Sequence, residues 1–168
     1  MGKKEDTKNI AMLFADGVKE QHPGDLPIIQ QQNGKDCFIL EIPPKDSDLF
    51  KQNFLLDDDE TILLARDTST WNKRKEGLVI TDRRIVYIPG KRDPHGRRYV
   101  IDFGSFIQVT YDAQRLLFWS SEDNFFAIPS VFFFKARLKS YDADRAIHML
   151  SKMLTKIAKL NGGVIQNP

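Results

Sequence analysis

Cysteine, long apolar runs and net charge are all scarce in this sequence. Cys37 has no second cysteine with which to form an internal disulfide, and no signal-peptide pattern opens the chain, so we expect a reducing, cytoplasmic setting. No apolar run approaches the roughly 20 residues that a helix needs to cross a bilayer. The 25 basic and 23 acidic residues leave a formal charge of +2, which by itself indicates neither nucleic acid nor a membrane as the partner.

Patterns typical of catalysis or metal binding are also missing. His22, His95 and His148 are far apart in the sequence and show no paired-ligand spacing, and there is no nucleophile-elbow or P-loop motif. The acidic run at 57–60 lacks the alternating ligands and central glycine of a calcium loop, so we interpret it as a solvated linker. We therefore expect a protein that is not an enzyme and that holds no cofactor and no metal.

The 168 residues, of which 41% are apolar and 29% charged, are enough for one folded domain with an appendage. Residues 1–59 are predicted to be that appendage, an N-terminal extension with too few apolar residues to fold alone. Helical spacing predicts a helix over about residues 6–21, and the apolar run at 37–42 predicts one strand. A cap at Asp46 or Ser47 then predicts a brief helical turn.

From Glu60 onward, short β-branched and aromatic runs alternate with turn residues, which is typical of an antiparallel meander. Seven strands are predicted, a number that suits a barrel or a sandwich; they cover about residues 61–69, 77–82, 84–89, 98–103, 106–112, 115–120 and 124–129. Apolar residues then return to a helical period, which predicts a closing amphipathic helix over about 142–160. This domain is expected to span residues 60–168.

One stretch within this domain carries a family resemblance. Residues 76–90 read EGLVITDRRIVYIPG, in which a strand ending in Thr-Asp leads through a basic turn into an apolar-aromatic strand. This stretch resembles the bacterial pleckstrin-homology-like (PH-like) and GRAM-like domains; residues 59–69 and 142–160 resemble their entry strand and last helix. The resemblance implies a seven-stranded antiparallel barrel closed by a C-terminal helix. It does not indicate a ligand, because this fold hosts lipid binders, peptide binders and oligomerising domains.

Positive charge is concentrated between residues 71 and 98, where nine basic side chains stand against three acidic ones. This segment carries a formal charge of +6. Because the whole chain carries +2, the remaining residues carry −4. Two basic clusters fall in the first and third hairpin loops, and alternate hairpins of an up-and-down barrel emerge at the same end. The candidate ligand-binding residues on this shared rim are Trp71, Lys73, Arg74, Lys75, Lys91, Arg92, His95, Arg97 and Arg98.

Three interpretations of this rim stay open: ordinary solvated loops, attraction to an anionic ligand or membrane, and an acidic protein partner. Trp71 is either a packing residue at a strand end or an anchor in a membrane interface. Lipid-binding PH domains use this rim. However, Leu78-Val79-Ile80 stand where the phosphoinositide signature has an arginine, so stereospecific headgroup recognition is not expected. Nucleic acid is disfavoured, because few aromatic residues lie among the basic ones.

The tetrapeptide Thr81-Asp82-Arg83-Arg84 is predicted to clasp a tight hairpin turn. The short oxygen-bearing side chains of Thr81 and Asp82 can accept backbone N–H bonds at a turn, and one of the arginines can lie across the acidic group. An anion site formed by the arginine pair is the alternative.

The apolar run Phe132, Phe133 and Phe134 lies between the last predicted strand and the closing helix. It is either buried beneath the helix and the N-terminal extension or exposed as a contact patch. We therefore expect a non-catalytic binding or scaffold module that engages a protein partner or copies of itself through a sheet edge and apolar surface. The alternative is peripheral binding to anionic phospholipid membranes through the loops at 71–75 and 91–98.

Overall fold

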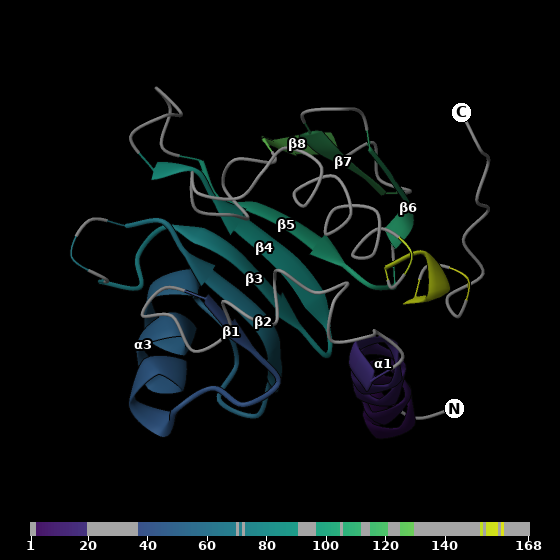
Figure 1. The fold of residues 1–168 in the computed structure, drawn as a ribbon, viewed down its shortest axis with the longest axis horizontal. Coiled ribbons are helices and arrows are strands. Elements are labelled where there is room, and N and C mark those ends of the chain that lie inside the picture. Colours follow the sequence, from purple (N-terminus) through teal and green to yellow (C-terminus); the bar gives the residue numbers. More distant parts are fainter. Residues whose placement is uncertain are drawn as a thin grey trace. The chain divides into compact units, whose positions relative to one another are not determined.

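The computed structural model is a mixed α/β structure that divides into two compact units (Figure 1). One unit contains Met1–Ala11 and Gln31–Val100, and the other contains Met12–Gln30 and Ile101–Pro168. The predicted domain boundary near residue 59 falls inside the first unit. The structure describes residues 3–19, 37–69, 71, 73–90, 97–104, 106–111, 115–120, 125–129, 152, 154–157 and 159.

The order of helices and strands follows the prediction. The elements are α1 (Lys3–Lys19), β1 (Cys37–Ile39), α3 (Pro44–Phe54), β2 (Ile62–Asp67), β3 (Gly77–Thr81), β4 (Arg84–Ile88), β5 (Tyr99–Asp102), β6 (Phe106–Tyr111), β7 (Arg115–Ser120) and β8 (Phe125–Pro129). Each of the seven strands predicted after Glu60 overlaps one of β2 to β8, and the strand predicted at 37–42 overlaps β1. Turn residues and apolar period are local signals, and they located these strands correctly.

The strands form two antiparallel sheets and not one closed barrel. Within the described residues, one sheet has the order β1-β2-β3-β4-β5 and the other has the order β6-β7-β8. β1 pairs with one edge of β2, from Cys37↔Arg66 to Ile39↔Leu64, and β3 pairs with the opposite edge. A strand has only two hydrogen-bonding edges, so β2 has no edge left for a closing strand along this stretch. The prediction of a closed seven-stranded barrel is therefore corrected to two separate antiparallel sheets among the described residues.

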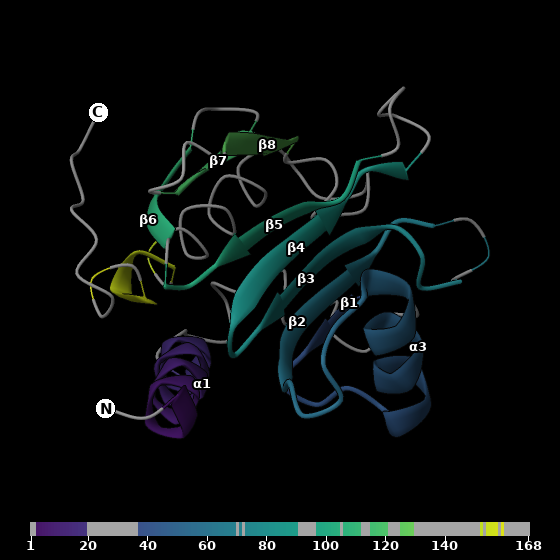
Figure 2. The same ribbon diagram turned by 180° about the vertical axis from the view of Figure 1, so that it is seen from behind.

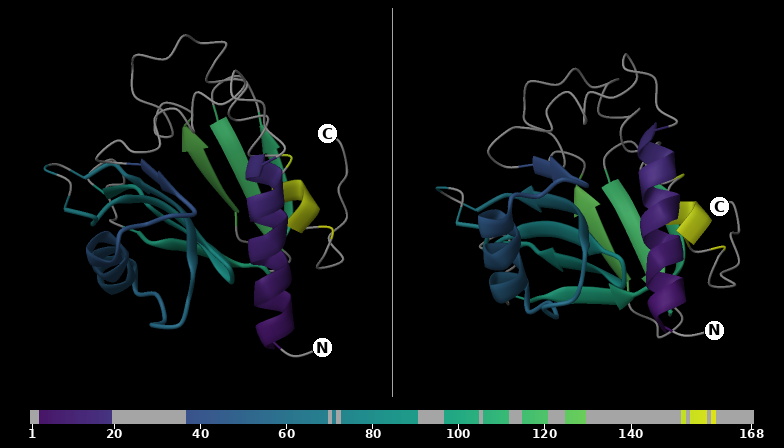
Figure 3. Two further views of the ribbon diagram at one scale, coloured as in Figure 1. Left: turned by 60° about the horizontal axis from the view of Figure 1, so that its bottom comes forward. Right: turned by 90° about the horizontal axis from the view of Figure 1, so that it is seen from below.

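Helix α3 packs on one face of the five-stranded sheet, as the rotated views show (Figures 2 and 3). The Phe50 ring centroid lies 6.2 Å from that of Phe38 on β1 and 5.7 Å from that of Phe54, both in edge-on geometry. The core cluster consists of Phe38, Phe50, Phe54, Leu56, Ile62, Ala65, Val79 and Val86. Every residue of β2 and β3 is buried, including the charged Arg66 and Asp67 that end β2.

The sequence around α3 explains where this helix begins and ends. Pro44 stands in its first turn, where the missing N–H is no loss, and Asp46 places negative charge at the N-terminal end of the helix dipole. The chain then turns out of the helix at Leu55 with φ 56°, and the Leu56 N–H donates to the Lys51 carbonyl at 2.9 Å. The predicted brief turn is thus an eleven-residue helix. Phe50 and Phe54 of this helix belong to the core cluster of the first unit.

The described parts of the two remaining predicted helices are amphipathic. In α1, Ile10 and Phe14 are buried while Met12 is 53% exposed. Near the C-terminus, Lys152, residues 154–157 and Lys159 have helical backbone, with Leu154 and Ile157 buried and the three lysines of this segment exposed. The rest of the helix predicted over 142–160, and the Phe132–Phe134 run, lie outside the described residues. No described helix is long and apolar enough to cross a membrane.

Candidate functional site

The loop between β2 and β3, residues 68–76, is organised by one buried carboxylate. Asp67 ends β2, and its Oδ1 accepts the Ser69 backbone N–H at 2.8 Å and the Ser69 hydroxyl. Its Oδ2 accepts the Arg74 backbone N–H at 3.1 Å and Arg74 Nη1 at 2.9 Å. The Thr68 N–H donates to the Glu76 carbonyl at 3.0 Å and closes the base of the loop. The described residues of the loop, Ser69 and Arg74 among them, are therefore tied to the Asp67 carboxylate.

Arg74, predicted as a ligand-binding residue, is buried inside this loop and is only 6% exposed. Its guanidinium pairs with Asp67 and also with Asp46 of α3, at 3.0 Å from Nε and 2.9 Å from Nη2. It lies over the rings of Phe38 and Phe50, 5.0 and 5.6 Å from their centroids. The prediction is corrected here, because a guanidinium with two carboxylates and two aromatic faces is occupied by the fold.

The neighbours of Arg74 point outward. Lys73 and Lys75 are exposed on either side of it, and Trp71 is 85% exposed. The alternative in which Trp71 packs at a strand end is therefore wrong. Trp71 has φ 64° and Arg74 has φ 57°, in the left-handed region that non-glycine residues rarely adopt. The loop thus separates its cluster into one inward arginine and an outward set of one tryptophan and two lysines.

The loop between β4 and β5 begins beside this set. A Cβ placed on Gly90, which has φ 68°, would overlap the Glu76 carboxyl, so the bases of the two loops are in contact at the same end of the sheet. Arg97 is exposed at the far end of the second loop. Arg98 is used by the fold, because Nε donates to the Phe54 carbonyl at 3.0 Å at the C-terminal end of α3. Lys91, Arg92 and His95 lie outside the described residues.

The outward-facing residues at this end, Trp71, Lys73, Lys75 and Arg97, are called the Trp71 rim below. Residues 57–60 precede β2 and lie at its other end, together with the turn that joins β3 to β4. Six residues of extended strand span about 20 Å, so the two ends are well separated. Asp57, Asp58 and Asp59 are exposed there. The exposed acids Asp57, Asp58 and Asp59 therefore lie at the opposite end of β2 from Lys73 and Lys75.

The turn between β3 and β4 is the clasp that the sequence predicted. Thr81 Oγ1 accepts the backbone N–H groups of Arg83 and Arg84 at 3.0 and 3.1 Å. Asp82 Oδ1 accepts the Thr61 N–H at 3.2 Å, and the Asp82 N–H donates back to the Thr61 carbonyl at 3.0 Å. Burial raises the pKa of the Asp82 carboxyl above its usual value, and the Thr61 N–H opposes part of that shift. The turn is thus tied to the segment that precedes β2.

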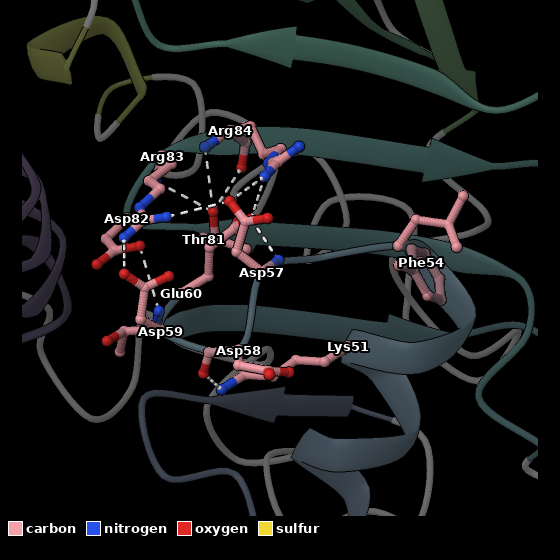
Figure 4. Close-up of polar contacts among 12 residues, drawn as sticks. Lys51, Phe54, Asp57, Asp58, Asp59, Glu60, Thr81, Asp82, Arg83 and Arg84 are labelled. Carbon is pink, nitrogen blue, oxygen red and sulfur yellow. Dashed lines mark hydrogen bonds and ion pairs between the residues drawn. The ribbon is translucent and has the colours of Figure 1, made fainter.

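The arginines of this turn bind the acidic run, as the close-up shows (Figure 4). Arg83 contacts Asp57 at 3.1 Å and Asp59 at 2.7 Å, and this hydrogen bond lowers the pKa of Asp59. Arg84 Nη2 contacts Asp57 at 3.1 Å and also the carboxylate of Glu60, which is 2% exposed. The solvated linker predicted at 57–60 is therefore corrected, since it supplies the partners of both arginines.

The described residues contain no group of three or more His, Cys, Asp or Glu side chains that could hold a metal ion. An open depression of about 430 Å³ lies at the C-terminal end of α3; its lining is Asp48, Lys51, Gln52, Leu55, Leu56 and Asp58. The three histidines lie outside the described residues, as does the side chain of Cys37 in β1. This lining offers charge and one apolar edge but no nucleophile beside a base, so the Trp71 rim is the stronger candidate.

Comparison with known proteins adds no relative. No protein-family model, no curated protein and no solved structure matches the chain. The candidate site therefore rests on its own geometry. Sequence reasoning missed Asp46 and Asp67 as partners of Arg74. The available signal was the order Asp67-Thr68-Ser69, in which an aspartate is followed two residues later by a serine, a pattern typical of an Asx turn.

Proposed function

We propose that this chain is a non-catalytic binding module of PH-like architecture that attaches to anionic membrane surfaces through the Trp71 rim. The seven strands β2 to β8, in which neighbours in sequence pair within each of the two sheets, and the helical residues 152, 154–157 and 159 support the PH-like part of the proposal. The observation that carries the binding part is the 85% exposure of Trp71 in the same loop as the exposed Lys73 and Lys75, with the exposed Arg97 at the same end of the sheet.

The magnitude is sufficient for reversible attachment. Each Lys or Arg close to an anionic leaflet contributes about 1 kcal/mol, so three cations contribute about 3 kcal/mol, or more than about a hundredfold in partitioning. A tryptophan ring is suited to the headgroup level, where its apolar body and N–H are both satisfied. The exposed acids at 57–59 lie at the other end of β2 and do not oppose the approach.

The rim is expected to respond to charge density more than to headgroup shape. An arginine offers a planar fork for bidentate phosphate binding, whereas a lysine acts as a point charge. Arg74 is engaged by Asp46 and Asp67, and Arg98 by the carbonyl of Phe54, so two arginines of the predicted cluster serve the fold. We therefore expect similar partitioning onto phosphatidylserine and phosphoinositide vesicles of equal surface charge.

Vesicle co-sedimentation tests the proposal. The full chain is expected to bind phosphatidylcholine vesicles that contain phosphatidylserine and to be released at about 1 M NaCl, where the Debye length falls to about 3 Å. The double variant Lys73→Met, Lys75→Met should lose most of this binding. The matched control Lys152→Met, Lys159→Met removes the same charge from two exposed lysines outside the rim and should retain it.

Equal losses in the two double variants would show that net charge and not the rim drives binding. Absence of binding to any anionic vesicle would overturn the membrane proposal. If light scattering then showed a concentration-dependent dimer, the protein-partner alternative would be favoured. That alternative was motivated by Phe132–Phe134, which lie outside the described residues.

A further inference from the structure

We propose that Arg74 is a positioning residue that locks the described residues of the loop at 68–76 onto helix α3 and so presents Trp71, Lys73 and Lys75 in a preformed arrangement. The inference rests on the proposed function for its consequence in binding, but its structural part stands on the geometry of the loop. Arg74 touches no ligand in this role. It acts on the exposed residues that flank it.

Helix α3 holds the loop at two adjacent residues. The Asp46 carboxylate receives the Arg74 guanidinium, and the Asn53 side-chain amide donates to the Lys73 carbonyl at 3.2 Å. Asp46 and Asn53 are seven positions apart, which is about 10 Å along the helix, although their two partners are neighbours in the loop. The helix therefore anchors this part of the loop from two separated positions. The Asp67 carboxylate fixes the same guanidinium from the strand side. One cation therefore joins helix, loop and strand.

The Arg74–Asp67 part of the lock is buried. The Arg74 side chain is 7% exposed, and the Asp67 side chain is fully buried. The Arg74 guanidinium lies over the rings of Phe38 and Phe50. A planar guanidinium can stack on an aromatic ring and bind two carboxylates at once, whereas a lysine ammonium cannot make the same set of contacts. Replacement of Arg74 by lysine therefore conserves charge and removes the fork.

Trp71 gives the reason for such a lock. Its φ of 64° is unfavourable for a bulky aromatic residue, and with 85% of its surface exposed its own packing contributes little to hold that conformation. Unfavourable backbone conformations persist only when the surrounding structure over-determines them. The contacts of Arg74, three residues along the chain, supply that constraint. A preformed loop binds without first losing conformational entropy, so loosening it lowers the apparent affinity in proportion to the population that is still competent.

The test uses a Trp119→Phe background, because the chain has two tryptophans and this change leaves Trp71 as the only one. In this background, Arg74→Lys should increase the fast component of the Trp71 fluorescence anisotropy decay while far-UV circular dichroism stays unchanged. Partitioning onto phosphatidylserine-containing vesicles should fall about fivefold to tenfold, as expected if the competent population falls to between about a tenth and a fifth. Its salt dependence should remain, because no charge is removed.

Lys73→Met is the matched control. It removes an exposed charge and leaves the lock intact, so it should weaken the salt dependence of partitioning and leave the anisotropy decay of Trp71 unchanged. Opposite signatures in the two variants separate positioning from direct attraction. If Arg74→Lys fails to fold, Asp46→Asn takes its place. Its side chain is 23% exposed, and its replacement leaves the Arg74–Asp67 pair in position.

The outcomes of the inference and of the proposed function are distinguishable. An anisotropy decay that is unchanged in a folded Arg74→Lys or Asp46→Asn protein overturns the inference, whatever the vesicles show. If Trp71 is more mobile in the variant but the parent does not bind vesicles, the positioning role of Arg74 is supported and the membrane function is overturned. Greater mobility together with unchanged partitioning shows that a preformed rim is not needed, which also overturns the inference.

Discussion

Truncation of Phe50 tests whether helix α3 is an integral part of the first unit. Phe50 is fully buried and its ring contacts those of Phe38 and Phe54, so Phe50→Ala removes a side chain that joins helix to sheet. Deleting a buried phenylalanine costs about 3–5 kcal/mol, because apolar contact is lost and a cavity remains. The free energy of unfolding of a domain is about 5–15 kcal/mol, so this loss is a large fraction of the total.

Urea denaturation followed by far-UV circular dichroism measures this effect. With a denaturant slope of about 2 kcal/mol per molar urea, the midpoint of Phe50→Ala should fall by roughly 2 M. Leu55→Ala is the control, since Leu55 lies just after the same helix and is 67% exposed. Its free energy of unfolding should stay within about 0.5 kcal/mol of that of the parent. Equal midpoints for the parent and Phe50→Ala would refute the packing of α3 on the sheet.

Three further predictions concern single side chains of the first unit. Arg84→Met should destabilise the protein by about 3 kcal/mol, since it leaves the buried Glu60 carboxylate without its cation. Arg83→Met should cost about 1 kcal/mol or less, because the carboxylates that Arg83 contacts are exposed. Comparable urea midpoints for the two variants would contradict this prediction. Leu55→Gly should raise the melting temperature, because Leu55 has φ 56° and glycine adopts this conformation freely; a lower value would count against the αL end of α3. Asp82→Asn should be more stable than the parent at pH 7. The folded pKa of Asp82 lies above its ordinary 3.8, so the parent gains stability from protonation as the pH falls through that raised pKa, and this gain is complete below 3.8. The advantage of Asp82→Asn should therefore shrink on acidification, and an advantage that grows instead would reverse the assigned sign.

Local sequence signals predicted the strands and the turn at Thr81. Thr81 bonds to the backbone of residues two and three positions away, so the relevant chemistry lies within one tetrapeptide. The seven strands likewise follow from apolar runs between turn residues. Each of these features depends on neighbours in the sequence, and no long-range pairing is needed to recognise them.

Arg74 shows why the candidate site was only partly predictable. In the sequence it is one of three consecutive basic residues, and nothing in this local pattern shows that Arg74 is buried while Lys73 and Lys75 are exposed. Its partner Asp46 is 28 positions away, and the pairing exists only because β1 and α3 are folded against the sheet. The same packing removed the edge of β2 that a closed cylinder would require. Both errors come from treating residues 1–59 as separate from the fold.

The separation of charge within the first unit makes the small net charge compatible with oriented binding to an anionic surface. At about 0.1 M salt the Debye length is about 10 Å, which is shorter than the distance of about 20 Å that β2 spans. A surface in contact with the Trp71 rim is therefore screened from the exposed acids Asp57, Asp58 and Asp59. Under the proposed function, the local charge of the rim is expected to govern binding, and not the formal +2 of the whole chain. Asp57 and Asp59 are also paired with Arg83, so the fold holds the acidic end in place. If the proposed binding occurs, we therefore expect the sheet to approach the surface with the Trp71 rim first.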